Sequence, residues 1–309
     1  MDRFFTTEPF FKKNGTAIAL YFLIAIVFWI VFLVIIPQLY MLDLSFKPNL
    51  YPLERGGAKD FYTLEHYRYF LFGSESSSGN FNSVDLSVFF RTITVSIFVT
   101  IANLMFCYPI AFYIAKVANA NTARMLIISL IIPFWINELL RSFALRILFA
   151  NEGVINNFLI SIGIIDQGIL FITHDVGLYT GLTYAYILLM MFPLYNAIES
   201  LDINQIEAAK DLGSSTIRTH LRVVIPHAKP GIVSGCTMVF MLTVGALATP
   251  VVLSSPNTMW FPQLIYQWFN LSDNWSRGSA YSIILLMVSV IFVLSMMKIF
   301  KVKIGEIIK

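Results

Sequence analysis

The residues with the clearest chemical potential gather around Glu138, in a sequence that is otherwise very apolar. A carboxylate beside aromatic rings attracts an organic cation, because the ring faces offer cation–π contact. The aromatic candidates are Trp135, Tyr184 and Tyr186. Glu138 also lies one helical turn before Arg141 and two before Arg146, and such neighbours pair readily on a helix. Glu138 therefore either binds a cationic amine or forms an ion pair with Arg141 or Arg146, and we favour the ion pair.

Other chemistries lack the residues that they need. The sequence has only four His and two Cys residues, and its His, Cys, Asp and Glu residues do not recur at metal-ligand spacing. No glycine-rich loop precedes Lys-Ser or Lys-Thr, the arrangement that cradles ATP phosphates. Cys107 and Cys236 fall inside apolar stretches, as small core residues do. We expect a chain that is not an enzyme and binds no metal or cofactor itself.

The elements that position these residues are membrane helices. Charged residues make up 13% of the chain, against about 25% in soluble domains. Long continuous apolar stretches favour helices over a barrel, and therefore an all-α fold. About 20 residues cross a hydrocarbon core of about 30 Å. Six stretches meet or approach that length: Ala17–Ile36, Thr92–Ala115, Met125–Leu145, Val176–Ile198, Gly231–Leu253 and Ser279–Met297.

The distribution of Lys and Arg predicts the orientation of these spans. With the N-terminus inside, 13 of the 21 Lys and Arg residues fall on the cytoplasmic side, as the positive-inside rule requires. The net charge of +3 therefore reflects topology and not a nucleic-acid partner. We expect a cytoplasmic lead (1–16), a six-helix domain (17–300) and a cytoplasmic tail (301–309). A long external segment with a serine-rich stretch, Gly73–Gly79, follows the first span.

A polar segment between the fourth and fifth spans, residues 199–230, predicts a helical hairpin. Asp202 can cap a helix over Ile203–Leu212, and Gly213 is a typical left-handed stop. A second short helix follows and ends before Pro226, because proline interrupts helical hydrogen bonding. From these residues alone, the segment is either a cytoplasmic docking element or an amphipathic loop on the membrane surface.

One spacing in this hairpin resembles a known family signature. Glu207-Ala208-Ala209 is followed by three residues, Gly213, nine residues and Val223-Val224-Ile225-Pro226. This pattern resembles the EAA loop of permease subunits of type I bacterial ABC importers, whose architecture is termed MetI-like. In that family the loop docks in a groove of the ATPase subunit. The resemblance implies that Glu207, Ala208, Ala209, Gly213 and Pro226 couple this chain to an ATPase.

Further stretches resemble, more narrowly, the permeases of spermidine/putrescine importers. They are Pro133-Phe134-Trp135, Leu140-Arg141, Gly153–Leu159, Gly163–Asp166 and Asp273-Asn274-Trp275. The resemblance covers roughly Ala17–Met297. The sequence departs from it at Gly245–Pro250 and in the long external segment, and these departures leave the exact solute open.

The resemblance implies that the chain is one part of a larger importer in the bacterial inner membrane. The implied partners are a second permease, two ATPase subunits that bind ATP and Mg, and an external substrate-binding protein. The implied solute is a polyamine, with Trp135, Glu138, Tyr184 and Tyr186 along its path. The alternatives are a permease for another small organic solute and a self-sufficient secondary transporter. The latter would show paired repeats with broken helices, which the sequence does not show.

Overall fold

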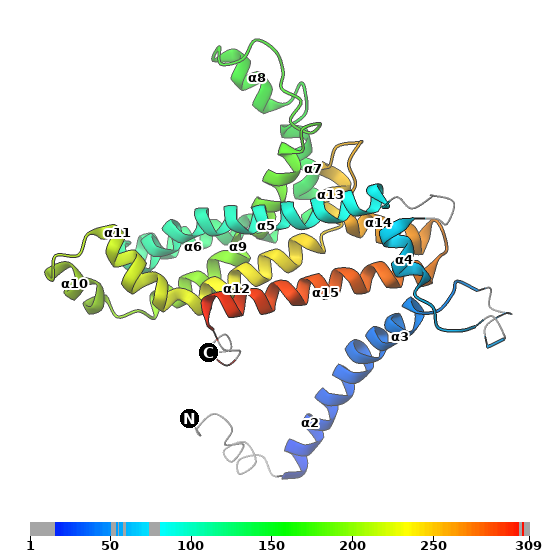
Figure 1. Ribbon diagram of the computed structural model, residues 1–309. Coiled ribbons are helices and arrows are strands. Elements are labelled where there is room, and N and C mark those ends of the chain that lie inside the picture. The colour runs from blue at the N-terminus through cyan, green and yellow to red at the C-terminus, as the bar shows by residue number, and fades with distance from the viewer. Residues whose placement is uncertain are drawn as a thin grey trace.

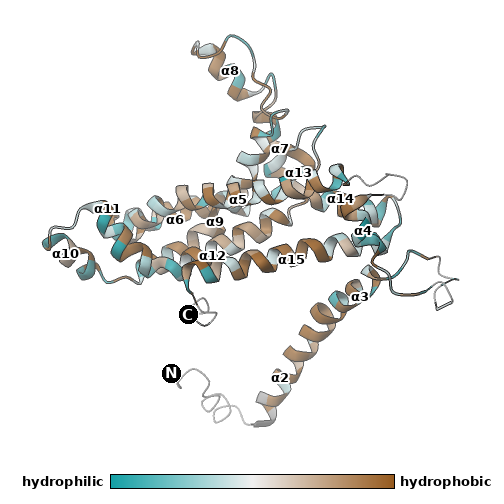
Figure 2. Ribbon diagram, viewed as in Figure 1, coloured by the Kyte–Doolittle hydropathy of each residue, from teal (hydrophilic) through white to brown (hydrophobic). Residues whose placement is uncertain are grey.

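The computed structural model describes residues 16–50, 54, 56–57, 60–73, 81–302 and 305, and this part of the chain is helical with no strand. Four long helices run side by side as a bundle (Figure 1): α5 (Ser83–Phe112), α9 (Val176–Glu199), α12 (Ile225–Val244) and α15 (Trp275–Phe300). In Figure 2 the middle of this bundle is largely hydrophobic, and hydrophilic residues gather at its two ends. This distribution is that of a bundle with its middle in lipid.

Parts of the expected organisation lie outside the described residues. Of the expected lead (1–16) the structure describes only Thr16, and of the tail (301–309) only Lys301, Val302 and Gly305. Most of the serine-rich stretch Gly73–Gly79 is likewise outside the described residues.

The centre of the bundle is the contact between α9 and α12, the most extensive between any two helices. Two glycines of α12 allow this close approach. A Cβ atom on Gly231 would lie 2.4 Å from the carbonyl oxygen of Pro193, and one on Gly235 would lie 2.7 Å from the sulfur of Met190. Small residues at such positions let helix backbones approach closely in a membrane. The crossing of α9 and α12 is therefore set by these two positions.

The all-α prediction is confirmed, and the six expected spans appear as five helices and one bent pair. Within the described residues, the helices long and apolar enough to cross a membrane are Leu20–Ser45, Ser83–Val117, Val176–Glu199, Thr216–Val244 and Trp275–Phe300. A sixth crossing is present if the bent pair Ala120–Trp135 and Glu138–Leu148 counts as one span.

The first span extends away from the bundle (Figure 1). It consists of α2 (Thr16–Ile30), the π-helical segment η1 (Val31–Ile35) and α3 (Ile36–Ser45). Its most apolar window has no buried residue, and only α3 packs against α15. Because the large hydrophobic side chains of α2 are exposed, lipid or another protein must cover them.

The prediction of a continuous third span over Met125–Leu145 is wrong. The chain forms α6 (Ala120–Ile131), the 3-10 turn η3 (Ile132–Trp135) and α7 (Glu138–Leu148), and the two helical parts meet at 94°. Pro133 lies at the start of η3, where its missing N–H interrupts the helical ladder. The side chain of Asn137 then accepts a hydrogen bond from Leu139 N at 2.8 Å and starts a new helix.

The expected fifth span over Gly231–Leu253 is wrong at both ends. The helix begins fifteen residues earlier, because α11 (Thr216–Thr219) continues through the π-helical segment η4 (His220–Val224) into α12. It stops at Val244, where the N–H of Ala246 turns back to Thr243 O. The short helix α13 (Ala248–Leu253) follows. Hydropathy marks the apolar part of a helix and not the points where its backbone starts and stops.

Short helices cover the end of the bundle opposite the hairpin. α4 (Glu65–Phe72) and α14 (Phe261–Asn270) pack on the first turns of α5 and α15. Aromatic rings fill this contact, with Phe70, Phe89, Phe261 and Tyr281 in mutual edge or stacked geometry. In Figure 1, α8 (Val154–Ser161) projects from the bundle beyond α7.

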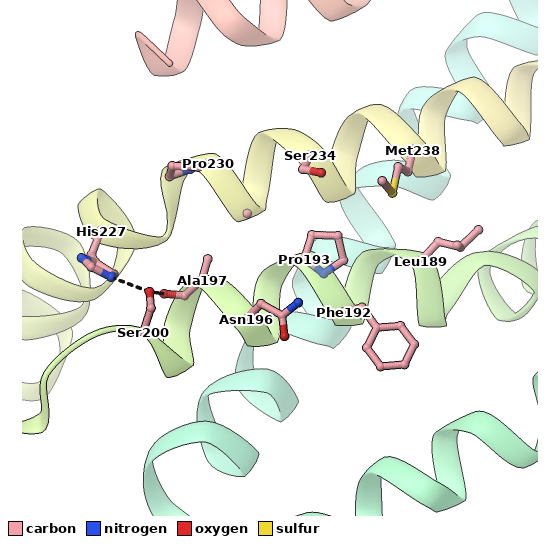
Figure 3. A pocket seen from close by; sticks show the side chains of 11 residues that line it. Leu189, Phe192, Pro193, Asn196, Ala197, Ser200, His227, Pro230, Ser234 and Met238 are labelled. Carbon is pink, nitrogen blue, oxygen red and sulfur yellow. Dashed lines mark hydrogen bonds between the residues drawn. The ribbon is translucent and has the colours of Figure 1, made fainter. Parts of the chain in front are cut away.

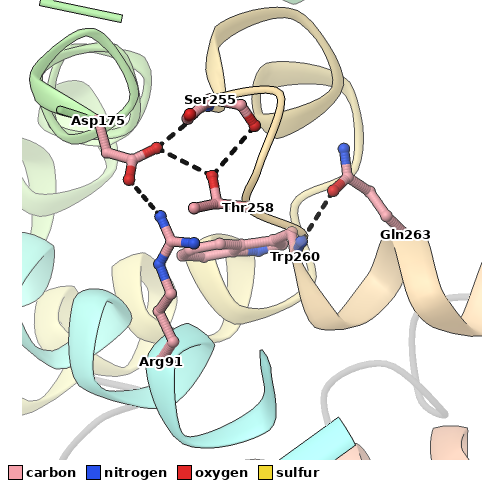
Figure 4. Close-up of polar contacts among 6 residues, drawn as sticks. All are labelled: Arg91, Asp175, Ser255, Thr258, Trp260 and Gln263. Carbon is pink, nitrogen blue, oxygen red and sulfur yellow. Dashed lines mark hydrogen bonds and ion pairs between the residues drawn. The ribbon is translucent and has the colours of Figure 1, made fainter. Parts of the chain in front are cut away.

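A buried polar network joins three segments near this end (Figure 4). Arg91 of α5 forms an ion pair with Asp175, the residue before α9. The other oxygen of Asp175 accepts hydrogen bonds from Ser255 N and Thr258 Oγ1, both at 3.1 Å. Hydrogen bonds of this kind offset the cost of burying the charge. The network fixes the loop after α13 against the ends of α5 and α9.

Candidate functional site

The polar hairpin lies at one end of the bundle, opposite α4 and α14 (Figure 1). Its first helix, α10, spans Ile203–Asp211, one residue shorter than expected. Asp202 caps it as predicted, with its side chain accepting from Asn204 N at 3.0 Å. Ile206, only 4% exposed, anchors α10 to the core. The hairpin therefore begins with a capped helix that is anchored to the core, and it is not an irregular loop.

Gly213 ends α10 in the left-handed conformation that the sequence predicts, with φ +77°. Two backbone hydrogen bonds close the turn, from Ser214 N to Ala209 O at 3.0 Å and from Gly213 N to Lys210 O at 2.8 Å. This is the Schellman arrangement of a helix C-terminus. A side chain at Gly213 would have free space around it, so the constraint at this position is backbone conformation.

The hairpin presents its EAA residues and an apolar tip to solvent. Glu207 and Ala208 are exposed and Ala209 is half-buried. At the turn, Leu212 is 90% exposed and Ile217 is 74% exposed. Glu207, Ala208, Leu212 and Ile217 are therefore all accessible from outside the chain.

The second helix of the hairpin does not end before Pro226, contrary to expectation. It runs from α11 through η4 into α12, so the second helix of the hairpin and the fifth span form one continuous rod. The π-helical turn bonds Ile225 N to His220 O and widens the helix just before Pro226. The proline then occupies the first turn of α12, where its missing N–H costs little.

Sequence reasoning missed the residue that holds this rod to α5. His220 Nδ1 lies 2.7 Å from the hydroxyl of Tyr108, and its ring packs edge-on against Phe112 with centroids 4.4 Å apart. His220 is itself in the π-helical segment η4, and on the partner helix the π-helical segment η2 (Tyr113–Val117) begins directly after Phe112. Single π-helical turns recur at functional sites. No spacing in the sequence indicates this contact, because 112 residues separate its two partners.

The structure places Glu138 at a junction of α7 and α13. Its carboxylate accepts a hydrogen bond from Thr249 Oγ1 at 2.7 Å, and Ser142 Oγ donates to the same threonine at 3.2 Å. Among the described residues, Glu138 forms no ion pair with Arg141 or Arg146. The favoured ion pair is therefore wrong: the bend before α7 brings α13 against Glu138, and Thr249 takes the arginine's place.

The three aromatic candidates have different surroundings at this junction. Tyr186 is buried and within electrostatic reach of Glu138. The guanidinium of Arg141, itself only 8% exposed, lies 5.4 Å from the centroid of the Tyr184 ring. Trp135 is 85% exposed and has no ring contact within the described part of the chain. The structure thus brings Tyr186 close to Glu138, places Tyr184 against Arg141, and leaves Trp135 exposed at the bend.

A groove of about 630 Å³ runs between α9 and α12 in the half of the bundle nearer the hairpin. Figure 3 shows its lining, with Pro193 and Asn196 on α9 and Pro230 and Ser234 on α12. At the hairpin end, His227 Nε2 and Ser200 Oγ are 3.0 Å apart and share a hydrogen bond. Among the described residues, no group of three or more His, Cys, Asp or Glu side chains is arranged to hold a metal ion.

No family model matches the sequence. The chain is 33% identical over 277 residues to the spermidine/putrescine transport system permease protein PotB of Haemophilus influenzae, a match that covers 87% of this chain and 91% of that protein. It is 32% identical to PotB of Escherichia coli over 86% of this chain and 92% of that protein. The inner membrane ABC transporter permease protein YdcU of Escherichia coli is 26% identical over 66% of this chain and 68% of that protein.

Solved structures show the same fold. A chain of a bacterial ABC transporter involved in the import of the acidic polysaccharide alginate superposes with a TM-score of 0.69 at 18% identity, over 95% of this chain and 99% of that chain. A second structure, of a bacterial alginate ABC transporter with an alginate pentasaccharide-bound periplasmic protein, gives 0.67 at 17% identity, over 93% of this chain and 95% of that chain. Identity of about one third to PotB proteins over most of the chain establishes the family as well as the fold. The chain belongs to the family of spermidine/putrescine transport system permease proteins, and it is a membrane transport subunit of an ABC importer and not an enzyme.

Proposed function

We propose that the chain is one permease subunit of an ATP-driven importer that carries polyamines such as spermidine and putrescine across the bacterial inner membrane. The observation that carries the proposal is the exposed hairpin with the Glu207–Gly213 spacing, built on α10 and continuous with α12. The similarity to PotB proteins of spermidine/putrescine transport systems supports the choice of solute.

The proposed coupling site is the hairpin, residues 199–230. Glu207, Ala208, Ala209 and Gly213 form the surface that docks on an ATPase, and Pro226 continues the rod into the membrane. The ATPase binds ATP and Mg and supplies the work. Its closure moves the hairpin, and the rod α11–η4–α12 tilts the bundle between two states. A second permease and an external substrate-binding protein complete the importer.

The proposed orientation places the hairpin and both chain ends in the cytoplasm. The excess of Lys and Arg on that side supports it, and Figure 1 shows the last turns of α15 at the hairpin end of the bundle. Residues 17–300 then form a single permease domain, with the lead (1–16) and tail (301–309) on the cytoplasmic side.

The proposed substrate path passes the junction of α7, α9 and α13. Glu138 supplies a carboxylate, and Tyr184 and Tyr186 supply aromatic faces for an ammonium group. Trp135, exposed at the bend, offers a further face beside this junction. An ionisable residue at membrane depth typically faces a cavity or a partner, which supports a functional role for Glu138.

The test is uptake of labelled spermidine by the complete importer in proteoliposomes. We expect uptake that requires ATP and the external binding protein, with competition by putrescine. Uptake driven by an ion gradient in the absence of the ATPase would instead show a self-sufficient transporter. Competition by an unrelated solute at lower concentration than putrescine would reject the polyamine assignment while keeping the importer class.

A further inference from the structure

The groove between α9 and α12 has a lining that a lipid-facing surface would not have. Asn196 of α9 is exposed along it, and Ser234 of α12 is half-buried in it. By contrast, the exposed residues of α15 are largely apolar, as at Leu286, Val290 and Leu294, and Ser295 is an exposed polar residue near its C-terminal end. Polar side chains at membrane depth face a protein interior or a water-filled space. The groove therefore opens to such a space.

Pro193 adds a backbone acceptor beside this lining. It has no N–H, so the carbonyl of Leu189 receives no ordinary helical hydrogen bond from it. Leu189 itself lines the groove, and Figure 3 shows Pro193 and Pro230 on the two helices that form it. Free carbonyl oxygens in a membrane are tolerated where they line a cavity.

The remaining walls are apolar, with Phe192 and Met238 at the mid-bundle end. Carbonyl and amide oxygens accept hydrogen bonds from an ammonium group, and the Phe192 ring offers it a face. The apolar walls suit methylene groups. None of the described residues that line the groove is Asp, Glu, Lys or Arg. A cation is thus accommodated there without a fixed opposite charge that would hold it.

We propose that this groove is a transit site for aliphatic ammonium ions, which takes the polyamine after it leaves the Glu138 junction and before it is released on the hairpin side. The proposal rests on the proposed function. It assigns the ammonium contacts to Leu189 O, Asn196 and Ser234, and the methylene contacts to Phe192 and Met238.

The test places a fixed positive charge in the groove. Asn196→Lys and Ser234→Lys repel a polycation at contact distance, whereas Asn196→Met and Ser234→Met add similar length without charge. In the complete importer, we expect the lysine variants to lower the maximal rate of spermidine uptake at least about tenfold. ATPase stimulation by the loaded binding protein should remain, because the hairpin is unchanged. The methionine variants lose the polar contact but add no repulsion, so we expect them to lower uptake clearly less than the lysine variants do.

A second measurement tests whether spermidine occupies the groove, and it does not depend on transport by a charged variant. Ser234→Cys should react with a methanethiosulfonate ethylammonium reagent, and spermidine should slow that reaction. The native thiols Cys107 and Cys236 are buried, so they contribute little background.

The outcomes separate the two proposals. Normal uptake by the wild-type importer together with unimpaired lysine variants would overturn the groove site alone. Equal losses in the lysine and methionine variants, or no protection of Ser234→Cys by spermidine, would also overturn it. Absence of polyamine uptake by the wild-type importer would overturn the proposed function, and the groove proposal with it.

Discussion

The hydroxyl of Tyr108 lies 2.7 Å from Nδ1 of His220, and this contact joins the hairpin rod to α5. His220 is in η4, between the exposed tip of the hairpin and the membrane part of α12. Any tilt of the rod must either carry α5 with it or break this hydrogen bond. Through this contact, a movement of the rod would be shared between α12 and α5.

Tyr108→Phe should weaken the link between ATP hydrolysis and transport. The ring and its packing remain, and only a hydrogen bond of about 1 kcal/mol is lost. We expect the number of spermidine molecules imported per ATP hydrolysed to fall about fivefold, since this energy is the size of a typical coupling free energy. The control is Tyr113→Phe at the first residue of η2, where the tyrosine is 46% exposed. Equal ratios in both variants would show that the contact has no role in coupling.

Gly213 should tolerate asparagine and reject proline. Its φ of +77° lies in the left-handed region, which asparagine visits and proline, fixed near −65°, cannot reach. We expect Gly213→Pro to abolish ATP-dependent uptake while the protein still inserts, and Gly213→Asn to keep at least about half of it. The measurement is uptake normalised to the amount of inserted protein. Full activity of the proline variant would mean that the turn does not shape the docking surface.

Glu138→Gln separates a substrate role from a structural one. Glutamine can still accept the hydrogen bond from Thr249 Oγ1, which is 2.7 Å from the carboxylate, but it carries no charge. If Glu138 attracts the polyamine, the Michaelis constant for uptake should rise about tenfold while the melting temperature stays the same. Thr249→Val, which removes the partner but not the charge, is the matched control. An unchanged Michaelis constant would reject the cation site.

Stability should fall on mild acidification because of His66. Burial lowers the pKa of this imidazole, and the nearby Arg277 acts in the same direction. Nε2 donates to Lys47 O at 2.9 Å, while the buried Nδ1 has no partner among the described residues. The unfolded chain therefore binds a proton below about pH 6.5 that the folded chain does not, and stability decreases as pH falls.

The measurement for His66 is the melting temperature in detergent between pH 7.5 and 5.5. We expect the melting temperature to fall as the pH is lowered through about 6.5, because the unfolded chain takes up the proton first. His66→Gln keeps a donor for Lys47 O but does not titrate, so its melting temperature should change less over this range. The same decrease in both proteins would assign the effect to other groups.

The elements that follow from local chemistry could be predicted from the sequence. Asp202 as a cap and Gly213 as a left-handed stop depend only on nearby residues, and both are confirmed. The spans that are wrong fail because proline and a helix cap change the course of the backbone in ways that hydropathy does not report. Pro133 and Asn137 divide the third span, and the π-helical turn before Pro226 lets the fifth begin early. Proline in a sequence indicates a perturbed helix but not whether it bends, breaks or widens.

The candidate site likewise combines residues that are close in the sequence with residues that only the fold brings together. The residues of the EAA spacing are close in sequence, so one segment contains the whole pattern. The partners of Glu138 and Tyr108 are 111 and 112 residues away, and no local pattern reports them. Arg141 and Arg146 are near Glu138 in the sequence and suggested an ion pair. The bend at Asn137 instead brings Thr249 against the Glu138 carboxylate.

The central claim is that the hairpin transmits work from an ATPase to this chain, and Glu207→Lys in the complete importer tests it most directly. The measurement is spermidine uptake together with ATPase stimulation by the loaded binding protein, in proteoliposomes with equal amounts of inserted protein. Glu152→Lys, an exposed charge reversal away from the hairpin, is the control. The account predicts loss of both activities in Glu207→Lys and near wild-type values in Glu152→Lys. Wild-type uptake and stimulation in Glu207→Lys would contradict it.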